Sequence, residues 1–217
     1  MALRILVADD HLIVRQGLRA LLERSGMEVV AEAGDGHEAV RLADKHKPDV
    51  AVLDLVMPNL NGLDAGRQIL QQSDSTRIVL LTMQTEDHQV AAALRAGIKA
   101  YLLKTQAAED LVEAIKEVMR GHVFLSSAVS RVVVDGYLSG TQAPLDPLAP
   151  REREVLQLVA EGKTSKEIAA MINVSVKTAE SYRANIMEKL DIHDTAGLTR
   201  YAIGAGIIES SVQLTIV

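Results

Sequence analysis

The sequence predicts an α/β domain with a doubly wound, five-stranded parallel sheet, followed by an all-α domain of four helices. Residues 1–121 alternate short apolar runs with amphipathic stretches, the pattern of buried strands and covering helices. A helix-poor stretch that contains Gly140 and Pro144 follows, and the pattern after it is purely helical. We therefore expect a second domain at 148–217, joined to the first by a linker at 122–147 that contains one helix.

Five segments of the first domain are predicted as strands. Three of them are continuous apolar runs without alternation, as expected of strands buried on both faces of a parallel sheet. The intervening stretches carry apolar residues at helical spacing, for example Val14, Leu18 and Leu21. Right-handed crossovers place such helices on both faces of the sheet. The clear strands are 3–8, 50–54 and 77–82, and the weaker ones are 28–33 and 100–103.

The second domain is predicted to hold four helices. Thr164 with Glu167 three residues later can form a capping box, and Ser175 can cap the helix after it. In the linker, the pair Ser126–Ser127 can cap a helix that runs to about Leu138. The four helices are predicted at 150–161, 165–171, 176–190 and 194–204, separated by Gly162, Asn173 and Ile192–His193.

Composition narrows the possible functions. With 48% hydrophobic residues the chain can bury a sizeable core, and 2% aromatic residues argue against stacking on single-stranded bases. The absence of cysteine excludes disulfides and cysteine nucleophiles, and suits a reducing cytoplasm. No run approaches the roughly 18 apolar residues of a membrane helix. We expect a soluble, cytoplasmic protein with no membrane partner, and we assign no role to the apolar tail, 206–217.

Net charge does not by itself indicate nucleic-acid binding. The whole chain has a net charge of −6, and residues 148–217 contain eight basic and nine acidic residues. Contacts with DNA must then depend on where individual charges lie, because neither domain is basic overall.

Polar residues interrupt the apolar runs at the carboxyl ends of the predicted strands. Asp9 and Asp10 end the first strand, Asp54 the third and Thr82 the fourth, and Lys104 follows the fifth. Ligand sites of open parallel sheets form at this edge. Three clustered carboxylates repel one another unless a cation lies among them, and a small set of oxygen ligands suits Mg²⁺. We expect Mg²⁺ between Asp9, Asp10 and Asp54.

The same cluster can perform phosphoryl chemistry. A metal-flanked carboxylate can attack a phosphoryl group and hold it as an acyl phosphate, while Lys104 neutralises its oxygens and Thr82 donates a hydrogen bond. Asp54 is the best candidate nucleophile because its strand is central and Pro58 and Gly62 shape the loop beside it. An isolated Asp pair is usually a turn or helix cap, and an isolated lysine is usually a solvated charge. Their convergence from four loops favours a phosphoryl site.

Residues 3–121 contain four motifs at these strand ends: Val7-Ala8-Asp9-Asp10-His11, Leu53-Asp54-Leu55-Val56-Met57-Pro58 with Gly62, Leu80-Leu81-Thr82, and Ala96-Gly97 leading to Tyr101-Leu102-Leu103-Lys104. Through them the segment resembles the receiver domains of response regulators, which have a flavodoxin-like fold. The resemblance implies that Asp54 accepts a phosphoryl group from a sensor histidine kinase and that Thr82 reorients toward it. It also implies that Tyr101 is the switch aromatic that turns inward behind Thr82. A half-buried strand tyrosine is the alternative. Met83 departs from the small residue usual in the wider family, which bears on the rates of phosphorylation and phosphate loss.

Helical phase suggests which face of 176–190 could contact DNA. A helix, a short turn and a longer helix are the arrangement that places the second helix in the major groove. The buried stripe is predicted to be Ala179, Ile186 and Leu190, with Tyr182 beside it. A four-helix module that binds protein is the alternative from phase alone. The opposite face carries Lys177, Ser181, Ala184 and Glu188, with Glu180 to one side.

Matching motifs extend through the second domain: Pro150-Arg151-Glu152-Arg153-Glu154-Val155-Leu156, Val159-Ala160-Glu161-Gly162, Lys166-Glu167-Ile168-Ala169, Val174-Ser175, Lys177-Thr178 and Ile186-Met187-Glu188-Lys189-Leu190. The segment resembles the LuxR-type helix-turn-helix of the NarL/FixJ family. Two departures are Ala149, where the family usually has a capping Thr, and Ala179, where Val is commoner. The resemblance implies contacts with double-stranded DNA from Lys177, Glu180 and Ser181, phosphate contacts from Thr178 and the Lys166 region, and a homodimer formed through Leu198, Tyr201 and Ala202.

These features together predict a response regulator, not an enzyme. Phosphorylation of Asp54 is expected to shift the population of receiver conformations and thereby to control sequence-specific DNA binding and transcription. A phosphatase of the haloacid dehalogenase type is one rival, but it needs a second acid two residues after the nucleophile, where this chain has Val56. A DNA-binding protein that works without phosphorylation is another. Its pocket would have lost an acid or the lysine, and here all are present.

Overall fold

The computed structural model describes residues 2–83, 87–138 and 146–209. It divides into two compact units between Leu145 and Asp146, which are described separately here. The predicted turn residues Gly140 and Pro144 and the tail beyond residue 209 lie outside the described part of the chain. Within that part, no helix is both long and apolar enough to cross a membrane.

The first unit is built on a parallel sheet whose strands follow the order β2-β1-β3-β4-β5-β6. β2 lies next to β1 at one edge of the sheet, and β3 to β6 follow in order on the other side of β1. The carboxyl ends of β1 and β3 therefore flank the point where the order reverses, the usual ligand position of doubly wound sheets. The strands are β1 (Arg4–Ala8), β2 (Glu28–Ala33), β3 (Val50–Asp54), β4 (Arg77–Thr82), β5 (Ala100–Leu103) and β6 (Phe124–Leu125).

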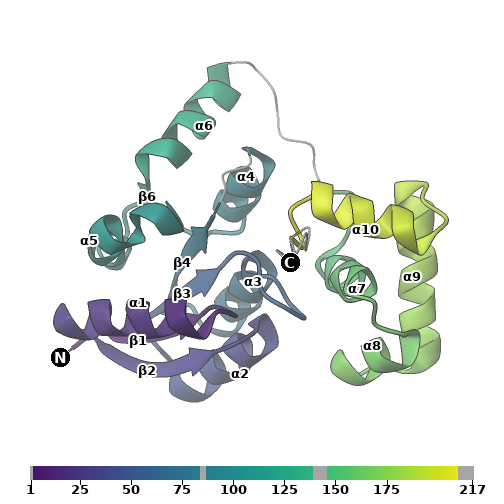
Figure 1. The fold of residues 1–217 in the computed structure, drawn as a ribbon, viewed down its shortest axis with the longest axis horizontal. Helices are drawn as coiled ribbons and strands as arrows, with labels where there is room; N and C mark the ends of the chain where they lie inside the picture. Colours follow the sequence, from purple (N-terminus) through teal and green to yellow (C-terminus); the bar gives the residue numbers. More distant parts are fainter. Residues whose placement is uncertain (1, 84–86, 139–145, 210–217) are drawn as a thin grey trace, which may run out of the picture. The chain divides into compact units, whose positions relative to one another are not determined.

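Helices cover both faces of this sheet (Figure 1). One core cluster joins one face of the strands to α2, α3 and α4, and the other joins the opposite face to α1 and α5. The strand residues Ile5, Leu6 and Val52 are fully buried, which explains why these strands are apolar without alternation. The helices are α1 (Leu12–Arg24), α2 (Gly36–His46), α3 (Gly62–Gln72), α4 (Asp87–Arg95) and α5 (Ala107–Met119), with a 3-10 turn, η1 (Lys104–Gln106), before α5.

The five predicted strands are all present, but the sheet has a sixth, β6, in the segment predicted as linker. Its backbone pairs with β5, where the Phe124 N–H donates to the Lys99 carbonyl at 2.8 Å. The helix after it, α6 (Ser127–Leu138), packs against α4 and buries Val129 in the core of the first unit. Ser126 does not cap α6 as expected, since its buried hydroxyl has no hydrogen-bond partner among the described residues. These two elements thus belong to the first unit.

The second unit is helical, as predicted. Its helices pack around a core that includes Val155, Ile168, Ala179 and Ile186. The helices are α7 (Pro150–Ala160), α8 (Ser165–Met171), α9 (Val176–Leu190) and α10 (Thr195–Gly204).

The helix ends of the second unit follow the sequence signals. The Thr164 and Glu167 side chains form the predicted capping box at α8, and the Ser175 hydroxyl accepts the Thr178 N–H at the start of α9. Asn173 turns the chain between them with φ of 54°. At α7, Ala149 has no side chain with which to cap, and only the reverse bond remains, from the Ala149 N–H to the Glu152 carboxylate at 2.8 Å.

Candidate functional site

The carboxyl ends of four strands bring polar side chains to one edge of the first unit. Asp9 follows β1, Asp54 ends β3, Thr82 ends β4, and Lys104 follows β5. The Lys104 ammonium nitrogen lies 2.7 Å from Asp9 Oδ2 and 2.8 Å from Asp54 Oδ2. The structure thus brings together the acids of β1 and β3 and the lysine, with one ammonium group between two carboxylates.

Burial sets the electrostatics of this cluster, which we call the acidic pocket (Asp9, Asp10, Asp54 and Lys104). Asp9 is fully buried, and Asp54 is only 5% exposed. Burial raises the pKa of Asp54 to about 7, the Lys104 ammonium opposes this, and the Asp9 and Asp10 carboxylates add to it. Burial alone would lower the pKa of Lys104, but the Asp54 and Asp9 carboxylates outweigh it and raise that pKa. The lysine therefore stays charged. Ionising Asp54 in the folded chain costs more free energy than ionising the same carboxyl group in water, because the side chain is buried.

The loop after β3 is held tightly against the end of its strand. A Cβ atom on Gly62 would lie 1.9 Å from the Asp54 carbonyl oxygen, so no other residue fits there without moving the backbone. The Gly62 N–H donates to the Leu55 carbonyl at 2.8 Å, and Asn59 takes a left-handed conformation with φ of 68°. This close return of the chain fixes the backbone from which the Asp54 side chain projects.

Asp10 and His11 stand at the more open side of the pocket. The Asp10 side chain is 32% exposed, and its Oδ1 lies 2.6 Å from Nδ1 of His11. Ligand atoms of Asp9, Asp10 and His11 all lie within 4.8 Å of one another. Sequence reasoning gave His11 no role, because a histidine after two acids is as easily a helix-start residue as a neighbour of the site.

Arg15 is a second residue that sequence reasoning missed. It lies on α1, and its Nη1 donates a hydrogen bond of 2.5 Å to the backbone carbonyl of Asp9. Its position four residues after His11 is typical of an ordinary helix face. The sequence therefore carries no signal that it reaches back to the strand end.

Thr82 and Tyr101 lie inside the fold rather than at its surface. Thr82 is buried at the end of β4, and Tyr101 is 1% exposed in the core of the first unit. The Tyr101 hydroxyl donates to Oε1 of Gln89, a buried residue of α4, at 3.4 Å. The alternative of a half-buried strand tyrosine is therefore wrong for this structure. Met83, in contrast, is 57% exposed.

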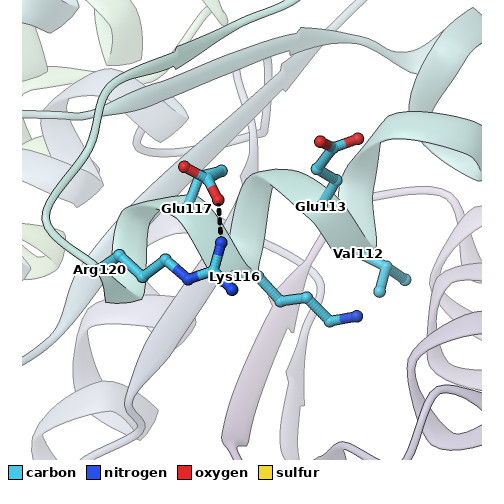
Figure 2. A pocket seen from close by; sticks show the side chains of 5 residues that line it. All are labelled: Val112, Glu113, Lys116, Glu117 and Arg120. Atoms are coloured by element: carbon cyan, nitrogen blue, oxygen red, sulfur yellow. Dashed lines mark hydrogen bonds and ion pairs between the residues drawn. The ribbon is translucent and has the colours of Figure 1, made fainter.

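A shallow groove of about 370 Å³ lies elsewhere on the first unit, along the surface of α5. Figure 2 shows the five side chains that line it, four from α5 and one from Arg120 directly after its end, with Arg120 paired to Glu117 at 2.5 Å. Its charges are of both signs and none of the predicted site residues contributes to it. It therefore does not compete with the acidic pocket as the functional site.

The exposed face of α9 is the one predicted from helical phase. Ala179 and Ile186 are fully buried, whereas Lys177, Glu180 and Ser181 are exposed. The Ser181 hydroxyl donates to the Lys177 carbonyl at 3.0 Å. Thr178, in the first turn of α9, and Lys166, on α8, are also exposed.

Side chains of α7 contact both helices of the helix-turn-helix, α8 and α9. The Glu152 carboxylate of α7 accepts a hydrogen bond of 2.7 Å from the Lys189 ammonium group of α9. Arg151 donates to the carbonyl of Ile172 at the end of α8 and pairs with the buried Glu154. These contacts join both helices to α7, and the face of α9 that carries Lys177 remains exposed.

Dimer contacts were expected from Leu198, Tyr201 and Ala202 of α10. This prediction is wrong for Leu198 and Ala202. Leu198 and Ala202 are 0% exposed, because they pack within the core of the second unit, in which α10 lies against α7. They have no surface to offer a second copy. Tyr201 is half-buried, while Arg200 and Ile203 of the same helix are exposed.

A phosphoryl-type acidic pocket on a parallel sheet, followed by a unit with an exposed helix-turn-helix face, defines the class of DNA-binding response regulators. Residues 5–116 match the family model of the response regulator receiver domain, and residues 146–202 match that of the luxR family of bacterial regulatory proteins. The chain therefore belongs to the two-component response regulators of the NarL/FixJ family, with a receiver domain and a LuxR-type helix-turn-helix domain.

Relatives of known function agree over nearly the full length. The chain is 40% identical over 203 residues to the transcriptional regulatory protein LiaR of Bacillus subtilis (strain 168), covering 92% of this chain and 96% of LiaR. It is 34% identical over 208 residues to the response regulator UvrY of Escherichia coli (strain K12), covering 94% and 95%. Among solved structures it is similar to RcsB of Salmonella enterica serovar Typhimurium, bound to the promoter rprA with phosphomimetic BeF₃⁻. That match has a TM-score of 0.58 and 32% identity over 92% of this chain and 97% of RcsB.

Proposed function

We propose that Asp54 accepts a phosphoryl group from a sensor histidine kinase and that this phosphorylation controls binding of the LuxR-type domain to DNA. The observation that carries the proposal is the Lys104 ammonium group between Asp9 and Asp54, at 2.7 and 2.8 Å. An Asp54 oxygen forms the new bond to phosphorus while the bond from phosphorus to the kinase imidazole nitrogen breaks. Lys104 stands where it neutralises phosphoryl oxygens, and Thr82 supplies a hydroxyl donor at the neighbouring strand end.

The residues of the pocket fit a magnesium ion. Receiver domains generally bind Mg²⁺ at an acidic pocket. In this chain the pocket has three carboxylates and one ammonium group. Burial and the other acids raise the pKa of Asp54 to about 7, which is consistent with too little positive charge around its carboxylate. Oxygen donors are the ligands that Mg²⁺ prefers. We propose Asp9, Asp10 and Asp54 as its ligands; when bound, it would neutralise charge on the transferring phosphoryl group.

Tyr101 and Thr82 form the proposed switch. Tyr101 is buried and its hydroxyl donates a hydrogen bond to Gln89, so the ring is linked directly to α4. A phosphoryl group adds about −1.5 to −2 charge beside Thr82, whose hydroxyl can then donate to it. Movement of Thr82 changes the space available to the Tyr101 ring, and the receiver equilibrium shifts toward the form that releases or pairs the DNA-binding domains.

For the DNA-binding domain we propose that α9 enters the major groove. Lys177, Glu180 and Ser181 would contact base edges, while Thr178 and Lys166 would contact phosphates; all five are exposed in the structure. The fixed attachment of α9 to α7 through Lys189 supports this use. We propose that two copies bind double-stranded DNA together in the cytoplasm, with the exposed face of α10 in the dimer contact in place of Leu198 and Ala202.

One experiment tests the proposed function as a whole. Wild type and Asp54→Asn are treated with acetyl phosphate and Mg²⁺, and acid-labile phosphate and affinity for genomic DNA fragments are measured. Asparagine keeps the shape of the side chain but is not a nucleophile, so the variant should lose labelling and the phosphate-dependent change in affinity. Unchanged acid-labile labelling of the variant would show that another residue accepts the phosphoryl group.

A further inference from the structure

We propose that Arg15 is a positioning residue for the acidic pocket: it fixes the peptide group between Asp9 and Asp10, and with it the directions in which both carboxylates project. The inference rests on the proposed function of the pocket as a magnesium and phosphoryl site. It concerns a residue on α1 that contributes no atom to that site.

The geometry places Arg15 directly on this peptide group. Its Nη1 donates to the Asp9 carbonyl at 2.5 Å. Because a peptide unit is planar, the Asp9 carbonyl and the Asp10 N–H turn together, and holding the oxygen holds the plane. On its other side, the Asp9 N–H donates to the Ala33 carbonyl at 3.2 Å. Both peptide groups of Asp9 are therefore anchored, one by the neighbouring strand and one by Arg15.

The surroundings of Arg15 show that this bond is its main contact. Its side chain is 17% exposed, and its Nε lies 3.9 Å from Oε2 of Glu32, too far for a hydrogen bond. Glu32 is paired instead with Arg19, whose Nη1 lies 2.8 Å from Oε1. Burying a guanidinium group costs free energy unless hydrogen bonds compensate it. The Asp9 carbonyl is the closest acceptor that the structure gives it.

The chemistry of the pocket makes this position matter. Mg²⁺ requires near-ideal octahedral geometry with ligands at about 2.0–2.1 Å, so a small rotation of the Asp9–Asp10 peptide would misplace a carboxylate oxygen. Groups that orient metal ligands without touching the metal commonly contribute roughly tenfold or more to metal affinity. Arginine suits the task because its planar, always charged group keeps a fixed donor direction.

Arg19 offers a matched control. It lies one helical turn further along α1 and pairs with the same Glu32, whereas among the described residues the hydrogen bond to the Asp9 carbonyl comes from Arg15. In Arg15→Met and Arg19→Met, each full-length chain loses a charge near Glu32, but only the first loses the bond to the pocket. The stability of the first unit against urea is followed by hydrogen exchange of peptides that contain β3, in EDTA and at increasing Mg²⁺, and its Mg²⁺ dependence gives the Kd.

The expected result is a Kd for Mg²⁺ raised roughly tenfold in Arg15→Met and within about twofold of wild type in Arg19→Met. Arg15→Lys, which retains a charged donor group but not the planar guanidinium, should have a Kd between those of wild type and Arg15→Met. Equal Kd values for Arg15→Met and Arg19→Met would overturn the positioning role, whatever the two variants do to stability in EDTA. If Mg²⁺ fails to stabilise even the wild type, the proposed metal site is itself wrong and the role of Arg15 falls with it.

Discussion

Replacing Asp54 by Asn should stabilise the first unit against unfolding in the absence of metal, by an amount that grows with pH. The carboxyl group has an ordinary pKa of 3.8, and in the folded chain burial and the neighbouring acids raise that pKa to about 7. Since the folded state holds the proton more tightly, it is favoured at low pH. That contribution to stability is lost as pH rises from the unfolded pKa through the folded one. Asparagine has no proton to lose and keeps a constant contribution.

The magnitude follows from this difference in pKa. One unit of pKa corresponds to about 1.36 kcal/mol, so the stability of wild type relative to Asp54→Asn should fall by roughly 2–3 kcal/mol between about pH 5 and pH 8. Most of the change should occur below pH 7, with little above pH 8. Lys104 stays protonated throughout, because its pKa is raised, and it does not contribute to the slope. The offset between the two chains at pH 5 depends on how well the amide replaces the carboxyl group beside Lys104.

The assay must report on the first unit alone, because the second unit unfolds with its own stability. Urea unfolding in EDTA, followed by pulsed hydrogen exchange of peptides that contain β3, meets this need. Asp44→Asn is the control, since its side chain is 65% exposed on α2. A pH-independent difference for Asp54→Asn would refute the assignment of the raised pKa to Asp54. Mg²⁺ at pH 8 should narrow the gap by stabilising only the wild type strongly.

Four further predictions concern single side chains. Asp10→Ala removes a proposed carboxylate ligand, so it should weaken Mg²⁺ binding and slow labelling by acetyl phosphate; an unchanged Kd in a Mg²⁺ titration would place the metal elsewhere. Glu180→Ala should relax preference at one base position by about 1–3 kcal/mol with little change in salt dependence, as expected if the carboxylate accepts from a cytosine amino group. Tighter binding of Glu180→Ala to every sequence would mean that Glu180 only repels the DNA backbone. Lys177→Ala, if the lysine contacts phosphate, should weaken binding to selected and scrambled sites equally and lower the magnitude of the salt slope by about one. Ala149→Ser should stabilise the second unit by about 1 kcal/mol in urea unfolding, because a serine hydroxyl can accept from a backbone N–H in the first turn of α7, which the alanine side chain cannot do; no change would mean that the bond to Glu152 already suffices.

The fold was predictable wherever burial leaves a pattern in the sequence. The strands that carry Ile5, Val52 and Leu80 are buried on both faces, and such strands are apolar over their full length. The caps at Thr164 and Ser175 were predictable for a similar reason, since local hydrogen bonds demand particular residue types at fixed spacing. In both cases one physical requirement acts on neighbouring residues and is therefore visible in the sequence.

What could not be predicted depends on contacts that leave no pattern of side chains in the sequence. β6 has two residues and is defined by backbone hydrogen bonds to β5, which no side-chain pattern records. Arg15 reaches the Asp9 carbonyl, again a backbone group. On α10, Leu198 and Ala202 are four residues apart, and an apolar stripe at this spacing looks the same whether its own domain or a second copy covers it. The structure shows that α7 and the rest of the domain core cover it.

The acidic pocket contains more negative than positive charge, which bears on the proposed switch. It contains three carboxylates and one ammonium group, and burial together with the neighbouring acids raises the pKa of Asp54 to about 7. Phosphorylation increases the negative charge at Asp54 further, so a buried hydroxyl donor at the end of β4 gains more by turning toward it than before. If Thr82 rotates toward that charge as proposed, the buried Tyr101 ring beside it and the hydrogen bond from the Tyr101 hydroxyl to Gln89 offer a route to α4.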